Sequence, residues 1–240
     1  MAKYCLLVLV SIYSFVGISQ EITPNTLLAK SIEYHDPNTA WESFRGTLYI
    51  TMETPNNSNR TSEVTLDFPS DYFKLVAKTD TITTTEIFNK GTCSFTVNGR
   101  TIMPKEDSKS NANNCGPILI MKNYYTYLYG LPMKLRDNGT ILAPAVHRKT
   151  FQGKEYLILK VTYEEKVGKD TWYFYFDPPT YAMEIYQFFH DESQNDGEYI
   201  LLDGIEEVRG MKIPKKRSWY TNKENQLLGT DLLTAYRDLD

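Results

Sequence analysis

The stretch TWYFYFDPPTYAMEIYQFF, residues 171–189, contains nine aromatic residues in nineteen positions. Its centre, Asp-Pro-Pro-Thr at residues 177–180, combines residue types that favour a tight turn. Both flanks are rich in the aromatic residues that are typical of strands. The stretch therefore predicts two antiparallel strands joined by a turn, because parallel neighbours need a crossover connection of a dozen residues or more.

Alternation within the first arm of this hairpin separates two faces. Successive side chains of a strand point to opposite sides, so Trp172, Phe174 and Phe176 share one face, and Tyr173 and Tyr175 share the other. We expect the face with Trp and Phe to be buried. A tyrosine face can be half-exposed, because the ring is apolar and the hydroxyl is polar.

The strands on either side extend the pattern. In the preceding segment, residues 154–165, one face holds Leu157, Leu159, Val161 and Tyr163, and the other holds Tyr156, Lys160 and Thr162. The second arm of the hairpin is ambiguous, because two pairs of residues compete for the buried face: Met183 with Ile185, and Tyr186 with Phe188.

Further segments have the composition of strands and are separated by short polar connections. They cover residues 41–54, 62–68, 72–78, 81–89, 93–97, 198–208 and 211–220. Asn98-Gly99 is a typical two-residue hairpin turn. Such short connections predict one large antiparallel meander.

Two segments are predicted to be helical. Thr23 can cap a helix that begins at Pro24 and ends near Pro37. A second, apolar helix lies between Pro117 and Pro132, where four residues share one helical face: Ile118, Met121, Tyr125 and Leu128. An apolar sheet face needs a cover. The predicted fold class is therefore α+β, mainly β: a large curved antiparallel sheet, an unclosed half-barrel, covered on its concave face by the N-terminal helix and the inserted apolar helix.

The first residues predict export. Lys3 precedes an apolar run from Tyr4 to Val16, and small residues follow at Gly17 and Ser19. The run is too short to span a bilayer comfortably, so residues 1–19 are interpreted as a cleaved signal peptide. A single domain is then expected over residues 20–240, in the periplasm or secreted from the cell.

Charge and cysteine content narrow the function classes. Without residues 1–19 the chain has 25 basic and 30 acidic residues, and this mild acidity argues against a nucleic-acid partner. Cys93 and Cys115 are the two remaining cysteines. In an oxidising compartment they are expected to form one disulfide, with two buried free thiols as the alternative.

The pattern resembles the LolA/LolB lipoprotein-carrier superfamily, most closely in the carboxyl half, residues 170–188 followed by residues 197–220. With the segments LLAKSIEYHDPN (27–38), YYTYLYGLPMKL (124–135) and LKVTYEEKVGKDTWYFYFDP (159–178), the chain is also similar to an uncharacterised secreted family common in Bacteroidetes. That second similarity covers nearly all of the mature sequence.

The resemblance implies a half-barrel around a hydrophobic cavity that holds acyl chains, with no catalytic residue and no cofactor. The residues themselves contain no zinc motif, and we expect no metal site. We therefore expect a monomeric, non-enzymatic protein that binds a lipid or an acylated protein and that can meet a membrane surface. Enclosure of an acyl chain is worth about 0.8 kcal/mol per CH₂ group. The candidate ligand-binding residues are Trp172, Phe174, Phe176, Leu157, Leu159 and Met183 from the sheet, with Tyr125 and Leu128 from the covering helix.

Two other interpretations remain open. A secreted hydrolase could use His190 with Asp191, or His147, since an imidazole beside a carboxylate suits general-base chemistry. The second interpretation is a structural envelope protein with a solid core. The acidic loop from Asp191 to Glu198 could bind a cation, although its spacing departs from an EF-hand. The basic run Lys215-Lys216-Arg217 is interpreted as a solvated strand end, with an anionic surface as its functional alternative.

Overall fold

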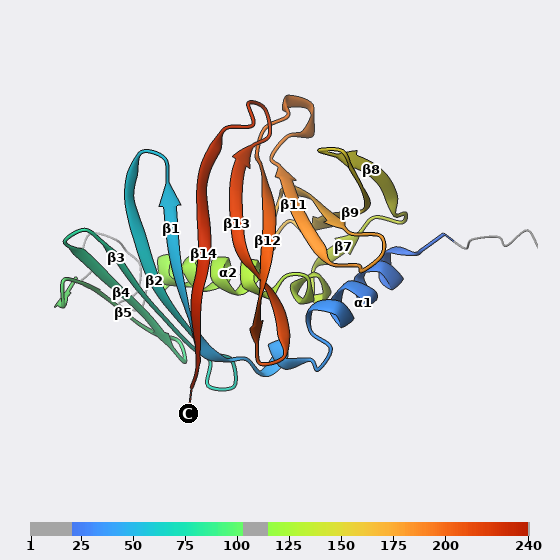
Figure 1. Ribbon diagram of the computed structural model, residues 1–240. Coiled ribbons are helices and arrows are strands. Elements are labelled where there is room, and N and C mark those ends of the chain that lie inside the picture. Colours follow the sequence, from blue (N-terminus) through green and yellow to red (C-terminus); the bar gives the residue numbers. More distant parts are fainter. Residues whose placement is uncertain (1–20, 103–114, 240) are drawn as a thin grey trace, which may run out of the picture.

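The computed structural model describes residues 21–102 and 115–239. The predicted signal peptide lies outside this range and stays a prediction. The described strands form one antiparallel sheet that does not close into a barrel, in the order β6-β5-β4-β3-β2-β1-β14-β13-β12-β11-β10-β9-β7, with β8 paired to β9 off this path (Figure 1). The predicted fold class is confirmed.

The elements have the following bounds. The first half of the sheet contains β1 (Arg45–Thr54), β2 (Asn57–Asp67), β3 (Tyr72–Thr79), β4 (Ile82–Asn89), β5 (Thr92–Val97) and β6 (Arg100–Thr101). The second half contains β7 (Thr140–Leu142), β8 (His147–Phe151), β9 (Lys154–Tyr163), β10 (Thr171–Phe176), β11 (Met183–Phe189), β12 (Glu198–Val208), β13 (Met211–Thr221) and β14 (Leu227–Asp238). The helices are α1 (Pro24–His35) and α2 (Gly116–Gly130), with short 3-10 helices η1 (Ala40–Ser43), η2 (Met133–Arg136) and η3 (Glu192–Gln194).

The last strand joins the two halves of the sheet. β14 lies between β1 and β13, and Ile50 of β1 pairs with Leu233. The sequence pattern does not predict β14, because its buried face includes Gly229 and Asp231 where a strand normally has apolar residues. The position of β14 therefore depends on its pairing with β1 and β13 and not on hydrophobic alternation.

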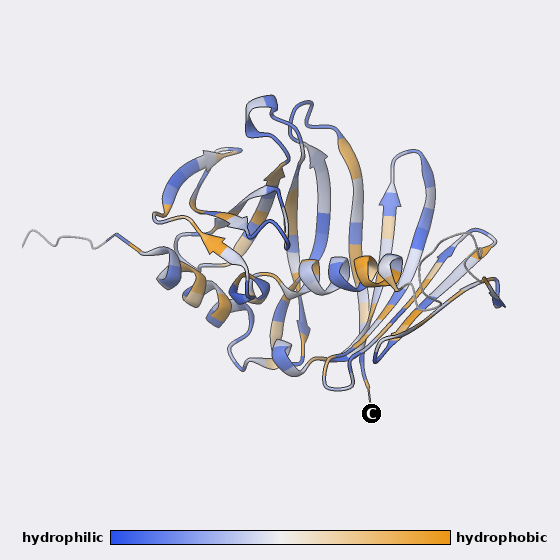
Figure 2. Ribbon diagram, turned by 180° about the vertical axis from the view of Figure 1, so that it is seen from behind, coloured by the Kyte–Doolittle hydropathy of each residue, from blue (hydrophilic) through white to orange (hydrophobic). Residues whose placement is uncertain are grey.

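The two helices begin where the sequence indicates. The Thr23 hydroxyl accepts a hydrogen bond from the Thr26 N–H at 3.2 Å, which caps α1. Figure 2 shows the molecule from behind, and in this view α2 lies in front of the sheet and crosses it. Cys115 at the start of α2 forms a disulfide with Cys93 of β5, with their Cα atoms 5.5 Å apart. The predicted disulfide is confirmed, and it ties one end of α2 to the sheet.

A β-bulge in β11 resolves the ambiguity of the aromatic hairpin. Tyr175 pairs with Ile185 and Phe176 pairs with Met183, so Glu184 has no residue opposite it. The extra residue reverses the alternation at this point. Met183 therefore lies in the main core with Tyr186 and Phe188, whereas Ile185 lies on the opposite face.

That opposite face has a core of its own, which corrects one expectation. Tyr156, Ile158, Tyr175 and Ile185 form a second apolar cluster, and Phe151 at the end of β8 packs against it. The rings of Phe151 and Tyr175 are 5.7 Å apart. Tyr173 is half-buried as expected, but Tyr175 is 0% exposed. The expectation of a half-exposed Tyr175 was wrong, because the side chains of β8 cover this face.

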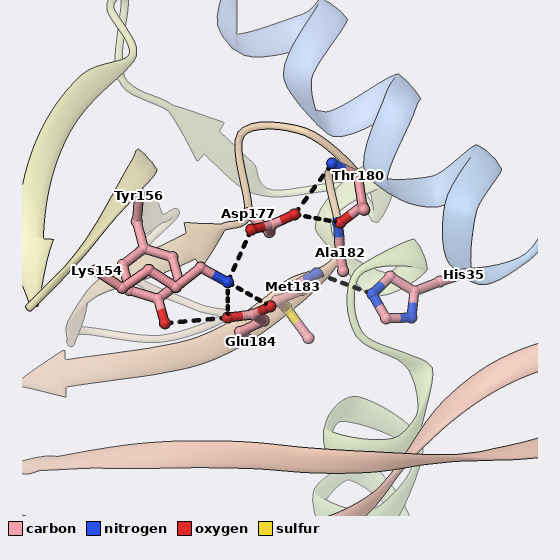
Figure 3. A network of polar contacts seen from close by, with 8 residues as sticks. All are labelled: His35, Lys154, Tyr156, Asp177, Thr180, Ala182, Met183 and Glu184. Atoms are coloured by element: carbon pink, nitrogen blue, oxygen red, sulfur yellow. Dashed lines mark hydrogen bonds and ion pairs between the residues drawn. The ribbon is translucent and has the colours of Figure 1, made fainter. Parts of the chain in front are cut away.

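Polar contacts fix the turn of the aromatic hairpin (Figure 3). The Asp177 carboxylate accepts hydrogen bonds from the Thr180 N–H at 3.1 Å and from the Thr180 hydroxyl at 2.6 Å. Lys154 forms ion pairs with Asp177 at 2.7 Å and with the bulge residue Glu184 at 2.8 Å. The Tyr156 hydroxyl also donates to Glu184. One lysine therefore links the turn and the bulge to β9.

Candidate ligand-binding groove

The eight predicted ligand-binding residues lie in or against the main core of the protein. Seven of them are buried: Phe174, Phe176, Leu157, Leu159, Met183, Tyr125 and Leu128. Trp172 is half-buried and packs against this core. The structure thus brings together residues from β9, β10, β11 and α2, which are far apart in the sequence.

Trp172 also borders a surface pocket of about 400 Å³. Its apolar wall includes the Tyr127 ring, 5.5 Å from Trp172. The Tyr127 and Tyr163 hydroxyls are hydrogen-bonded at 2.5 Å. The remaining lining residues are Asn123, Thr126, Lys134, Asp137, Val167, Gly168 and Asp170. The volume falls within the range of small-molecule sites, about 300–1,000 Å³.

A second pocket of about 500 Å³ adjoins the first along α2. It shares four lining residues with the first pocket: Asn123, Thr126, Lys134 and Asp137. Its apolar lining residues are Ile32, Trp41, Phe68 and Met133. We name the two pockets together the α2 groove. It has aromatic residues at both ends and polar residues between them.

The hydroxyl groups of the groove stay neutral. Burial raises the pKa of Tyr127 well above its usual value, and the neighbouring Tyr163 raises it further. Burial raises the pKa of Tyr163 to about 12. Both side chains are therefore uncharged phenols near neutral pH, which suits contact with an apolar ligand.

An aromatic stack leads from the groove into the core. The Trp172 ring lies parallel to the Phe174 ring at 6.1 Å, and its centroid is 4.9 Å from Phe188 and 6.2 Å from Tyr186. Offset and tilted pairs of this kind are the favoured aromatic arrangements. Trp172 is therefore the surface member of a continuous aromatic wall.

Arg217 is a residue of this core that the sequence interpretation misplaced. It was interpreted as part of a solvated strand end, yet Arg217 is 1% exposed while Lys215 and Lys216 are exposed. The signal was present in the alternation, since Arg217 shares its strand face with Ile213 and Trp219, which belong to or pack against the core. The guanidinium lies 3.9 Å above the centre of the Tyr129 ring.

The histidines do not form the arrangement that the hydrolase interpretation requires. The His190 Nδ1 contacts the Asp170 carboxylate at 2.7 Å, and this hydrogen bond raises the pKa of His190. Asp191 instead accepts a hydrogen bond from the Ser193 N–H at the start of η3. His147 is exposed at the start of β8. Within the described residues, no serine or cysteine side chain is hydrogen-bonded to His190 or His147.

The carboxylates of the acidic loop serve contacts within the protein. Asp196 accepts hydrogen bonds from the N–H groups of His190 and Asp191. Glu192 pairs with Lys160 at 2.8 Å. In residues 21–102 and 115–239, no three His, Cys, Asp or Glu side chains gather closely enough to hold a metal ion. Over the same ranges, the structure contains no helix with the length and apolar character needed to cross a membrane.

The half-open antiparallel sheet with a helix across one face is similar to solved structures of other proteins. A LolA superfamily protein from Nitrosomonas europaea superposes on this chain with a TM-score of 0.52 and 10% sequence identity, over 91% of this chain and 94% of that one. A putative outer membrane lipoprotein-sorting protein domain from Vibrio parahaemolyticus aligns with a TM-score of 0.47 and 11% identity, over 88% and 93% of the two chains. The resemblance in fold inferred from the sequence is confirmed.

The chain belongs to a family of unknown function (DUF6503), whose profile matches residues 2–235. A search among curated proteins finds no match.

Proposed function

We propose that this protein is an exported, non-enzymatic carrier that binds the apolar part of a lipid or of an acylated protein at the α2 groove. The fold shared with a LolA superfamily protein supports this class of function. The disulfide supports an oxidising compartment, either the periplasm or the cell exterior. The signal peptide predicted for residues 1–19 agrees with that location.

The observation that carries the proposal is the position of Trp172. This large apolar ring is half-buried, borders an open pocket and continues as an aromatic wall into the core. Because the deeper residues Phe174 and Phe176 are fully buried, a ligand first contacts Trp172 and Tyr127. The other predicted ligand-binding residues lie behind them in the same buried core.

The two adjoining pockets together suit a ligand with a long apolar part. The first contains Trp172, the second contains Trp41 and Phe68, and Asn123 and Thr126 of α2 line both. Each CH₂ group that leaves water there contributes about 0.8 kcal/mol. Lys134 and Asp137 border both pockets and can contact a polar part of the ligand.

The proposal is tested by extraction and by direct binding. Protein purified from the cell envelope is denatured, and the released lipids are identified by mass spectrometry. Purified protein is then titrated with N-phenyl-1-naphthylamine, an uncharged dye that fluoresces in apolar surroundings. We expect stoichiometric lipid and saturable dye binding, with Trp172→Ala and Tyr127→Ala each weakening dye binding roughly tenfold.

The matched control is Tyr220→Ala, which removes a half-buried ring that stacks on Tyr199. Since Tyr220 borders neither pocket of the groove, this variant is expected to bind dye as the parent does. Absence of both lipid and saturable dye binding would overturn the proposal and favour a structural protein with a solid core. Equal losses in all three variants would place dye binding outside the groove.

A further inference from the structure

Charged side chains form a straight row across the buried face of the sheet. Arg60 of β2 pairs with Met52 of β1, Met52 pairs with Asp231 of β14, and Asp231 pairs with Arg217 of β13. Arg217 and Asp231 are both almost completely buried. Ionised groups are rarely buried unless they are paired, so this row requires a physical explanation.

The buried guanidinium of Arg217 is held in place by α2 and by its own strand. It donates a hydrogen bond to the Pro214 carbonyl at 2.8 Å and another to the Leu128 carbonyl at 3.4 Å. Its planar face lies on the Tyr129 ring. These contacts leave the Nε–H of Arg217 buried and without a hydrogen-bond partner in the described part of the chain.

Other polar atoms around Arg217 are also unpartnered. In residues 21–102 and 115–239, nine buried side-chain N or O atoms lack a hydrogen-bond partner. Five of them lie at or beside Arg217, and we name them the polar cluster: Arg217 Nε, Tyr129 OH, Tyr186 OH, Trp219 Nε1 and Asp231 Oδ1. In folded proteins about nine in ten buried polar groups are hydrogen-bonded, so five such atoms together form a place where a polar group can bind.

The chemistry of these atoms indicates which partner fits. Four of the five can donate a hydrogen bond, and an ionised Asp231 is the one group among them that can only accept. A carboxylate accepts about four hydrogen bonds through its two oxygens. Burial raises the pKa of Asp231, which weakens its repulsion of a second anion.

This polar cluster lies one ring behind the α2 groove. Tyr127 of α2 contacts Trp172 in the groove, while its neighbours Leu128 and Tyr129 contact Arg217. On the sheet side, Tyr186 lies 6.2 Å from Trp172, and the Arg217 guanidinium beside it opposes the rise that burial causes in the pKa of the Tyr186 hydroxyl. Trp172 therefore borders the groove on one side and contacts Tyr186, a member of the cluster, on the other.

We propose that Arg217, together with the hydroxyls of Tyr129 and Tyr186, binds the carboxylate head of a fatty-acid-like amphiphile whose chain lies along the α2 groove. This inference rests on the proposed carrier function and specifies its ligand. The carboxylate exchanges its hydration shell for charge-assisted hydrogen bonds, which are about twice as strong as neutral ones. The chain remains in contact with Trp172 and Tyr127.

The test compares two ligands with the same chain. Dodecanoate and 1-dodecanol are each used to displace N-phenyl-1-naphthylamine from the full-length protein near neutral pH. The proposal expects dodecanoate to displace the dye at a concentration about tenfold lower than dodecanol, because a hydrogen bond to a charged group adds about one factor of ten in affinity.

The decisive variants are Tyr129→Phe and Tyr186→Phe. Within residues 21–102 and 115–239 neither hydroxyl has a hydrogen-bond partner of good geometry, so each variant should change the denaturation midpoint little. Each should nevertheless weaken dodecanoate about fivefold and leave dodecanol unchanged. Tyr175→Phe is the control, because it removes a partnered hydroxyl on the other face and should not alter dodecanoate binding.

The outcomes separate the two proposals. Equal displacement by the acid and the alcohol would overturn the carboxylate site and leave the carrier function standing. An unchanged dodecanoate preference in both tyrosine variants would also overturn the site. Absence of dye binding in the parent protein would overturn the carrier function and the site together.

Discussion

The side chain of His35 in α1 accepts a hydrogen bond at 3.0 Å from the backbone N–H of Met183 in β11, 148 positions further along the chain (Figure 3). Its other ring nitrogen donates to the Lys212 carbonyl of β13 at 2.7 Å. One neutral imidazole therefore satisfies two backbone groups of different strands and fixes α1 against the sheet. A protonated ring could no longer accept the hydrogen bond from Met183.

This arrangement predicts acid sensitivity. Burial lowers the pKa of His35 from 6.5 to about 4. The unfolded chain therefore binds a proton at higher pH than the folded chain, and the contribution of His35 is complete above pH 6.5 and is lost as the pH falls towards 4. The loss amounts to roughly 3 kcal/mol. Urea unfolding at about pH 7 and about pH 4 measures it.

A variant separates His35 from the carboxylates, which also titrate in this range. In His35→Gln, the amide can still donate and accept, but it does not titrate. The fall in unfolding free energy between the two pH values should be smaller than in the parent by about 3 kcal/mol. His147→Gln changes an exposed histidine, so its unfolding free energy should fall between the two pH values by as much as that of the parent. An equal fall in all three proteins would refute the role of His35.

Both faces of β10 should respond as core. Phe174 and Tyr175 are each 0% exposed, so Phe174→Ala is expected to cost about 3–5 kcal/mol and Tyr175→Ala a similar amount. Tyr175→Phe isolates the hydroxyl, which donates to the Gln187 side chain at 2.5 Å. Its removal should cost about 1–3 kcal/mol because Gln187 is buried. Chemical denaturation measures these differences. A Tyr175→Ala variant as stable as the parent would contradict the finding that β8 covers this face of β10.

The hairpin and its neighbours could be predicted because hydrophobic alternation is regular there. Leu157, Leu159, Phe174 and Phe176 all lie on the face that period-two counting assigns to them. The bulge at Glu184 could not be located from the sequence, since either pair of apolar residues could have faced the core. Its position depends on pairing with β10.

The missed features share one physical cause: polar residues on a buried face. The pattern of β14 is hidden by Asp231, and Arg217 counts as a surface residue on any hydropathy scale. Both are buried because the strands on either side place them under α2. The α2 groove is likewise formed by segments around residues 41, 123–137 and 163–172, which are far apart in the sequence and are brought together by the fold.

The disulfide should contribute measurable stability. It closes a loop of 22 positions, for which chain entropy predicts about 3 kcal/mol. The paired substitution Cys93→Ala with Cys115→Ala should lower the unfolding free energy by about that amount. Adding a reductant should destabilise the parent and leave the paired variant unchanged. If reductant leaves the denaturation curve of the parent unchanged, the disulfide does not constrain the unfolded chain.

The end of α2 provides a steric test of how the helix sits on the groove. A Cβ atom added at Gly130 would lie 2.5 Å from the Trp41 indole, which is closer than real contacts allow. Gly130→Ala must therefore shift Trp41 or lift the end of α2, at a cost of about 1–3 kcal/mol. In the Trp41→Ala background the same substitution should be nearly neutral, so the two changes should show a coupling energy in a double-mutant cycle.

Gly168→Ala is the matched control, since its added Cβ would meet Tyr163 at an ordinary 3.6 Å and should change stability little. Additive effects of Gly130→Ala and Trp41→Ala would mean that α2 does not rest on the Trp41 ring, and the second pocket of the α2 groove would then have to be assigned differently.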